Sequence, residues 1–238
     1  MWTRPAKRGA ATYQPANLLT GNPRLGLNKT DLHAALADLA SREPAFAAAI
    51  ARAGLPEPRV SQRGYTTLLR TIVGQQVSVA SADAMWRKLG EIVGEDYAPA
   101  ALLAASDESL RAGGLSRQKA VYARSLGALI ASGELDLAAL PTDDEDAIQM
   151  LTRAKGIGRW SAEIYLLFAE GRPDIWPAGD LAVQIEVGRI LGHEERPSEK
   201  LIRQLAEPWR PHRGAAAVFA WHHYGWRLAG DKAAKMPI

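Results

Sequence analysis

The chain has 238 residues, a formal net charge of +3 at pH 7 and no cysteine. This length suits one domain or two tightly joined lobes, and the missing cysteines exclude disulfides and a four-cysteine iron–sulfur cluster. The sequence contains no run of 18 apolar residues, which excludes a membrane-spanning helix, and its mildly basic charge is compatible with a nucleic-acid partner without proving one.

The first 28 residues are basic, rich in Pro, Gly and Asn, and lack the apolar core of a signal peptide. We therefore expect residues 1–28 to form a flexible tail, and the protein to be cytoplasmic, or nucleoid-associated if its source is bacterial. Amphipathic patterns then predict helices over 30–39 and 44–53, the second opened by Pro44. Residues 54–58 break the helical pattern.

Apolar residues at helical spacing predict further helices in the middle of the chain. Serine precedes three of them, at Ser78, Ser106 and Ser116, where its side-chain oxygen can cap the first free N–H groups. The next helix is expected to open with a capping box of Thr142 and Glu145. The predicted segments are 64–73, 78–92, two short helices within 99–112, 117–132 and 142–151.

Helical patterns continue to the end of the chain, and no strand-like alternation or internal repeat is present. The sequence therefore predicts an all-α fold. The remaining predicted helices are 159–169, 181–191, 198–206 and 214–226.

The turn Lys155-Gly156-Ile157-Gly158 separates two of these helices. Glycine tolerates positive φ and lets another molecule approach the backbone, and a helix N-terminus presents free N–H groups and a positive dipole end. Such a turn can bind one phosphate without reading sequence. Lys155, Arg159 and the Ser161 hydroxyl are candidate additional donors. The alternative is that glycine ends one helix before the next begins.

Asp180 is the candidate functional acid. It follows Pro-Ala-Gly and precedes an apolar run, so it also fits the N-cap of the 181–191 helix, where the dipole favours a negative charge. The two roles are compatible. Glu163 and Asp174 are the competing acids, placed by the pattern on a helix flank and in a loop.

The segments GIGRWSAEIYLL and RPDIWPAGDLAVQ resemble the helix-hairpin-helix, Gly/Pro…Asp (HhH-GPD) signature of a DNA glycosylase superfamily, with Pro177 and Asp180 as its Pro and Asp. Residues 68–89, 114–126 and 209–221 resemble its 3-methyladenine DNA glycosylase II (AlkA-type) branch. The resemblance runs from about residue 35 to the C-terminus. It implies a compact form without an N-terminal β domain, with two helical lobes around a DNA-binding cleft. One lobe would combine 29–62 with 171–238, and the other would be 63–170.

The resemblance also implies roles for individual residues. Asp180 would be the catalytic acid, and Gln76, with Gln75 beside it, would be the wedge that fills the gap left by a flipped base; helix capping is the alternative for both amides. Aromatic faces for the base would come from Trp160, Trp221 and Trp176, although core packing fits Trp176 better. A second backbone site would use Ser116, Arg117 and Lys119, and a sodium or potassium ion could bind the carbonyls of Thr152, Lys155 and Ile157.

Trp160 stands where bifunctional relatives carry a nucleophilic lysine, which implies a monofunctional enzyme that leaves the strand intact. No second acid stands out to protonate a neutral leaving base, so the implied substrates are cationic alkylated purines such as 3-methyladenine and 7-methylguanine in double-stranded DNA. We expect a monomer without a cofactor, apart from the possible hairpin ion. The alternatives are a mismatch or oxidised-base glycosylase and a non-enzymatic helix-hairpin-helix DNA-binding module.

Overall fold

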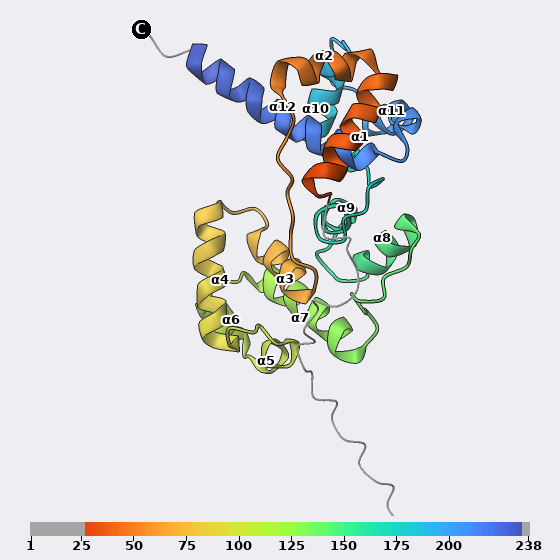
Figure 1. Ribbon diagram of the computed structural model, residues 1–238. Helices are drawn as coiled ribbons and strands as arrows, with labels where there is room; N and C mark the ends of the chain where they lie inside the picture. The colour runs from red at the N-terminus through yellow and green to blue at the C-terminus, as the bar shows by residue number, and fades with distance from the viewer. Residues whose placement is uncertain (1–26, 235–238) are drawn as a thin grey trace, which may run out of the picture.

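The computed structural model describes residues 27–234, and the predicted tail lies almost entirely outside this range. The described residues form helices joined by short loops, with no strand among them, so the predicted all-α fold is confirmed (Figure 1). None of these helices is both long and apolar enough to cross a membrane. The helices are α1 (Lys29–Arg42), α2 (Pro44–Ala53), α3 (Tyr65–Gly74), α4 (Val79–Val93), α5 (Pro99–Ala104), α6 (Asp107–Ala112), α7 (Arg117–Ser132), α8 (Asp144–Thr152), α9 (Arg159–Phe168), α10 (Leu181–Ile190), α11 (Glu199–Leu205), the 3-10 helix η1 (Glu207–Trp209) and α12 (Arg213–Ala234).

The three predicted serine caps are confirmed. Ser78, Ser106 and Ser116 each precede a helix in extended conformation. Each hydroxyl accepts a hydrogen bond from the backbone N–H three residues later, at 3.2, 3.0 and 3.2 Å. These local bonds explain why α4, α6 and α7 begin where the sequence predicts.

The predicted capping box at Thr142 is wrong. The residue before α8 is Asp143, whose carboxylate accepts hydrogen bonds from the N–H groups of Glu145 at 2.9 Å and Asp146 at 3.0 Å. A carboxylate at this position also interacts favourably with the positive end of the helix dipole, which a hydroxyl does not. The helix therefore begins two residues later than predicted.

We expect Asp143→Ala to lower the free energy of unfolding by about 1 kcal/mol, because two N–H groups of α8 lose their acceptor. Thr142→Ala is the matched control and is expected to change this free energy by less than about 0.5 kcal/mol. Urea denaturation of both variants measures the difference. Equal losses in the two variants would contradict the assignment of the cap to Asp143.

The last helix is longer than the sequence predicts. α12 runs from Arg213 to Ala234, whereas the pattern indicated an end at Trp226. Gly225 and Gly230 lie inside it without stopping it, and both are exposed. A glycine in an exposed helix costs only about 1 kcal/mol, which is too little to end a helix.

The helices form two groups, as Figure 1 shows. α1, α2, α10, α11 and α12 pack together at one end, α3 to α7 pack at the other, and α8 and α9 lie between them. The division into two lobes, 29–62 with 171–238 and 63–170, stays a prediction. The aromatic core of the first group includes Phe46, which contacts the rings of Trp209 at 5.0 Å and Phe219 at 5.8 Å between centroids.

The segment between α2 and α3 runs from one group to the other and is fixed on α9. The N–H of Ser61 donates to the carbonyl of Phe168 at 2.9 Å, and the N–H of Gly64 donates to the hydroxyl of Tyr165 at 2.9 Å. Burial raises the pKa of Tyr165 to about 12, so this hydroxyl stays protonated at neutral pH. These bonds bring residues 58–61 beside the face of α9.

A buried ionic cluster joins α10 to α12. Glu186, which is fully buried, accepts hydrogen bonds from the Nδ1 of His223 at 2.7 Å and the Nε of Arg227 at 3.0 Å. Because Asp180 precedes α10 and Trp221 lies on α12, this cluster helps to fix the two residues relative to each other.

Candidate active site and DNA interface

Asp180 is the N-cap of α10, as predicted. Its Oδ1 accepts hydrogen bonds from the N–H of Val183 at 3.0 Å and the indole Nε1 of Trp221 at 3.1 Å. Its Oδ2 accepts one from the indole Nε1 of Trp160 at 2.8 Å. Three N–H donors from α9, α10 and α12 therefore hold the carboxylate in one orientation and stabilise its negative charge.

The carboxylate faces a cavity of about 560 Å³. The six-membered and five-membered rings of a purine fit a cavity of this size, and the aromatic walls offer faces for stacking. Trp160 is 47% exposed, which leaves much of its indole surface open to a ligand. The lining residues are Pro58, Arg59, Val60, Ser61, Trp160, Ile164, Phe168, Asp180 and Trp221.

The two competing acids do not line this cavity. Glu163 is 3% exposed at its side chain and pairs with Arg159 at 2.9 Å; burial raises its pKa despite this neighbour. Asp174 pairs with Arg210 at 2.6 Å and Arg213 at 2.8 Å. Among the three candidate acids, Asp180 alone faces the aromatic cavity.

The structure corrects the assignment of Trp176 to the base pocket. Trp176 is 4% exposed, donates its indole N–H to the carbonyl of Ile202 at 3.2 Å and packs edge-on against Trp209. Trp176 therefore belongs to the core, and core packing is also the role that the sequence favours for it. Trp160 and Trp221 lie in the cavity, and their contact with a base stays a prediction.

The helix-hairpin-helix consists of α8, the turn of residues 153–158 and α9. Gly156 has φ +86° and lies against the ring of Tyr122. Glycine suits this position because it tolerates a positive φ and has no Cβ to meet the ring. Gly158 has an extended backbone at φ −84° and precedes α9 without a side-chain cap. A Cβ on Gly158 would meet no atom of residues 27–234 within 4 Å, so this part of the protein leaves the start of α9 open to an anion.

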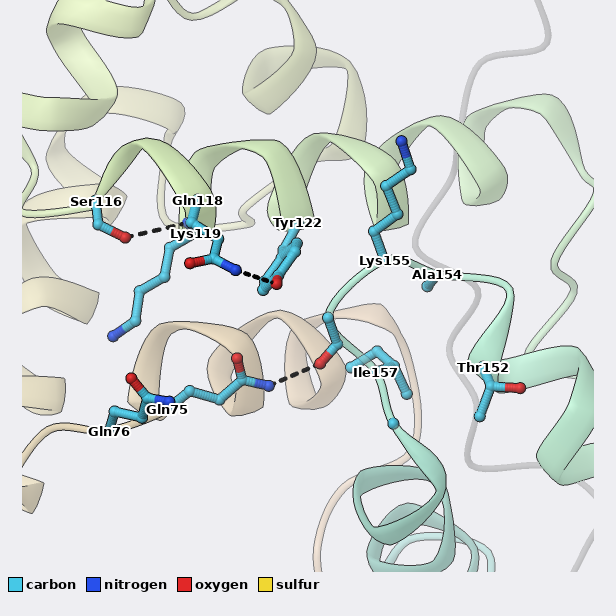
Figure 2. A pocket seen from close by; sticks show the side chains of 12 residues that line it. Gln75, Gln76, Ser116, Gln118, Lys119, Tyr122, Thr152, Ala154, Lys155 and Ile157 are labelled. Carbon is cyan, nitrogen blue, oxygen red and sulfur yellow. Dashed lines mark hydrogen bonds between the residues drawn. The ribbon is translucent and has the colours of Figure 1, made fainter.

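A second cavity, of about 380 Å³, lies beside the hairpin and is shown in Figure 2. It is bounded by the turn, the start of α7 and the loop after α3, and its lining includes Ser116, Lys119, Thr152 and Lys155. The side chain of Lys119 points toward the loop of Gln75 and Gln76 (Figure 2) and donates to the carbonyl of Val73 at 2.7 Å. Burial lowers the pKa of Lys119.

Two predicted phosphate donors are engaged or buried inside the protein. The guanidinium of Arg159 donates to both carboxylate oxygens of Glu145, at 2.8 and 2.5 Å, and to Glu163. Ser161 is 8% exposed and does not line the cavity beside the hairpin. The structure corrects the assignment of Ser161, because its side chain is buried. The side chain of Arg159 is 42% exposed, so its contact with a phosphate stays a prediction. Arg117 is exposed and makes no ion pair with a described residue, but it lies outside this cavity.

The side chains of Gln75 and Gln76, which are adjacent in the loop after α3, have different surroundings. Gln75 donates its Nε2 to the carbonyl of Gly156 at 2.8 Å, so it holds the loop against the hairpin and does not project as a wedge (Figure 2). Gln76 is exposed at the tip of the loop with φ 57°, an uncommon value outside glycine. The structure corrects the wedge assignment of Gln75, and that of Gln76 stays a prediction.

Six of the residues that line the aromatic cavity are not predicted from the sequence. Two of them could have been found, because Ile164 and Phe168 follow Trp160 at intervals of four and therefore share one face of α9. The other four belong to the irregular segment between α2 and α3, which carries no periodic signal. They are Pro58, Arg59, Val60 and Ser61.

The chain is similar to several proteins of known sequence or structure. The crystal structure of a DNA-3-methyladenine glycosidase from Bacillus halodurans is 29% identical, with a TM-score of 0.72, covering 84% of this chain and 91% of that chain. The structure of a 3-methyladenine DNA glycosylase from Schizosaccharomyces pombe in complex with abasic DNA is 26% identical, with a TM-score of 0.68, covering 79% of this chain and 95% of that chain. The Bacillus subtilis protein YfjP is 27% identical over 165 residues, which are 66% of this chain and 58% of that protein.

The family model of the HhH-GPD superfamily of base excision DNA repair proteins matches residues 69–211, which include α8, the hairpin, α9 and Asp180. This match covers more than half of the sequence, and the structure has the same fold as the solved relatives. The chain therefore belongs to the HhH-GPD superfamily of base excision DNA repair proteins.

Proposed function

We propose that the protein is a monomeric, monofunctional DNA glycosylase that hydrolyses the N-glycosidic bond of alkylated purines in double-stranded DNA. The observation that carries the proposal is the carboxylate of Asp180, held by two indole N–H groups at the wall of an aromatic cavity. The names of relatives from Bacillus halodurans and Schizosaccharomyces pombe support the substrate class.

The reaction begins with a base flipped out of the duplex, because a stacked base cannot be reached. The C1′–N bond breaks, its electron pair stays on the base nitrogen, and the sugar acquires positive charge. The fixed carboxylate of Asp180 stabilises this charge better than mobile solvent does. A water then bonds to C1′ and its extra proton passes to solvent, which leaves a free base and an abasic site.

The acid and the aromatic walls of the cavity favour a base that is already positively charged. A purine alkylated at N3 or N7 leaves as a neutral molecule, so it needs no acid to protonate it. Asp180 is the only acid among the lining residues that the structure describes. Trp160 and Trp221 offer stacking and cation–π attraction to a flat, cationic ring.

Strand cleavage through a Schiff base would need a lysine beside C1′. Among residues 27–234, no lysine lines the aromatic cavity, and Trp160 occupies the position after the hairpin. We therefore propose that the product strand stays intact.

The DNA backbone would be held by the N–H groups at the start of α9 and by cationic side chains near the second cavity. Gln76 would fill the gap in the stack from the exposed tip of its loop. The carbonyls of Thr152, Lys155 and Ile157 would hold a sodium or potassium ion, which would add positive charge to the hairpin.

The test is a base-release assay on duplexes that contain 3-methyladenine, 7-methylguanine or hypoxanthine, with chromatography of the released base. We expect both methylated bases to be released faster than hypoxanthine, with the strand intact until alkali cleaves the abasic site. Strict selectivity for one mispaired, unmodified base would contradict the proposal. Binding to DNA without release of any base would indicate a non-enzymatic binding module instead.

A further inference from the structure

Arg59 is the one cationic residue among the described residues that line the aromatic cavity. It lies in the segment between α2 and α3, where the bond from Ser61 N–H to the carbonyl of Phe168 fixes the backbone nearby. Its guanidinium carbon lies over the ring of Phe168, 5.4 Å from the centroid. The Phe168 ring lies 5.6 Å from that of Trp221, whose indole N–H bonds to Asp180. A continuous row of contacts thus joins Arg59 to the candidate catalytic acid.

The N–H groups of Arg59 are unused within residues 27–234, where no hydrogen bond or ion pair engages its side chain. Nearby arginines are different: Arg63 pairs with Glu170 at 2.5 Å, and Arg159 pairs with Glu145. A guanidinium carries five N–H donors in a rigid plane. Arg59 therefore brings free donors and a positive charge to a cavity that would hold the base.

A positive charge at this position has opposite effects on the release of cationic alkylated purines and of neutral purines. A cationic alkylated purine is repelled by Arg59 and leaves as a neutral molecule, so the guanidinium has no leaving-group charge to stabilise. A neutral purine leaves as an anion, because the electron pair of the broken C1′–N bond stays on its ring until solvent supplies a proton. The planar guanidinium fork also matches the O6 and N7 acceptors on the edge of a 6-oxopurine such as hypoxanthine.

We propose that Arg59 is a specificity-determining residue that binds the O6/N7 edge of a flipped neutral purine, such as hypoxanthine, and stabilises the anion formed when the base leaves. This inference rests on the proposed function and deepens it. The aromatic faces and Asp180 would serve every substrate, whereas Arg59 would extend the reaction to bases that carry no positive charge.

The test compares Arg59→Gln and Arg59→Lys with the wild-type protein on duplexes of one sequence containing either hypoxanthine or 7-methylguanine. With enzyme in excess, the ratio of the hypoxanthine rate constant to the 7-methylguanine rate constant is expected to fall at least about tenfold in Arg59→Gln. A smaller fall is expected in Arg59→Lys, which keeps the charge and loses the fork. Arg52→Gln is the matched control, because Arg52 is exposed on α2 outside the cavity, and its ratio should equal that of the wild type.

The outcomes separate this inference from the proposed function. An unchanged ratio in Arg59→Gln overturns the role of Arg59. An equal loss on both substrates, with a shallower dependence of affinity on salt, also overturns it, because that result places Arg59 on a phosphate. A wild-type protein that releases 7-methylguanine but no hypoxanthine overturns this inference alone. A wild-type protein that releases neither base overturns both.

Discussion

Asp180→Asn is expected to slow the release of 7-methylguanine by at least about a hundredfold, the usual loss when a charge-stabilising group is removed from a transition state. The amide has the size of the carboxylate but carries no negative charge to oppose the positive charge on the sugar. It also breaks the hydrogen-bond pattern. If the amide oxygen stays near Val183 and Trp221, the NH2 group faces the indole N–H of Trp160, and two donors then meet.

The variant should fold and bind DNA. Asparagine is as good an N-cap as aspartate, so α10 keeps its cap and the free energy of unfolding should change by less than about 1 kcal/mol. We expect the affinity for a duplex containing an abasic-site analogue, measured by fluorescence anisotropy, to stay within about threefold, because the DNA backbone is held elsewhere.

Glu163→Gln is the control for the loss of a nearby acid. Glu163 is almost fully buried and lies outside the cavity, so its replacement should leave the rate of base release within a few-fold of the wild type. Near-normal release by Asp180→Asn would remove the catalytic assignment. A hundredfold loss in Glu163→Gln with normal stability would transfer that assignment to Glu163.

The fold could be predicted from the sequence because its signals are local. Serine caps and apolar spacing act within a few residues, and they placed the starts of α4, α6 and α7 correctly. Two predicted helix boundaries are wrong, the start of α8 and the end of α12. Thr142 and Asp143 are adjacent candidate caps, and the carboxylate at Asp143 is the one that binds α8. Gly225 stands in a helix that continues past it.

The site could be predicted only in part. The pattern placed Asp180 before a helix and Gly156 in a turn, because both are properties of one short segment. The contacts of Arg159 and Trp176 depend on residues that are distant in sequence. Arg159 pairs with Glu145, and Trp176 packs against Trp209. The segment that carries Arg59 has no periodic pattern, so only its hydrogen bonds to α9 reveal that it lines the cavity.

Gly156→Ala is expected to lower the free energy of unfolding by about 2–5 kcal/mol, from the cost of a left-handed residue with a side chain and of overpacking. The new Cβ would lie 2.3 Å from Cδ2, 2.4 Å from Cγ and 2.9 Å from Cβ of Tyr122, so the whole tyrosine or the turn must move. Movement of the turn also breaks the bond from Gln75 to the carbonyl of Gly156. We therefore expect the affinity for DNA to fall about tenfold or more as well.

Gly158→Ala separates the phosphate site from the packing of the turn. Its backbone conformation is open to any residue, and a Cβ there meets no atom of the described residues within 4 Å. The free energy of unfolding should therefore fall by less than about 1 kcal/mol. The methyl group would nevertheless occupy the space through which a phosphate approaches the N–H groups of α9, so DNA affinity should again fall about tenfold. Urea denaturation and anisotropy measure the two quantities on each variant. If Gly158→Ala binds DNA as the wild type does, the phosphate is not held at this turn, and the affinity lost in Gly156→Ala would reflect misfolding alone.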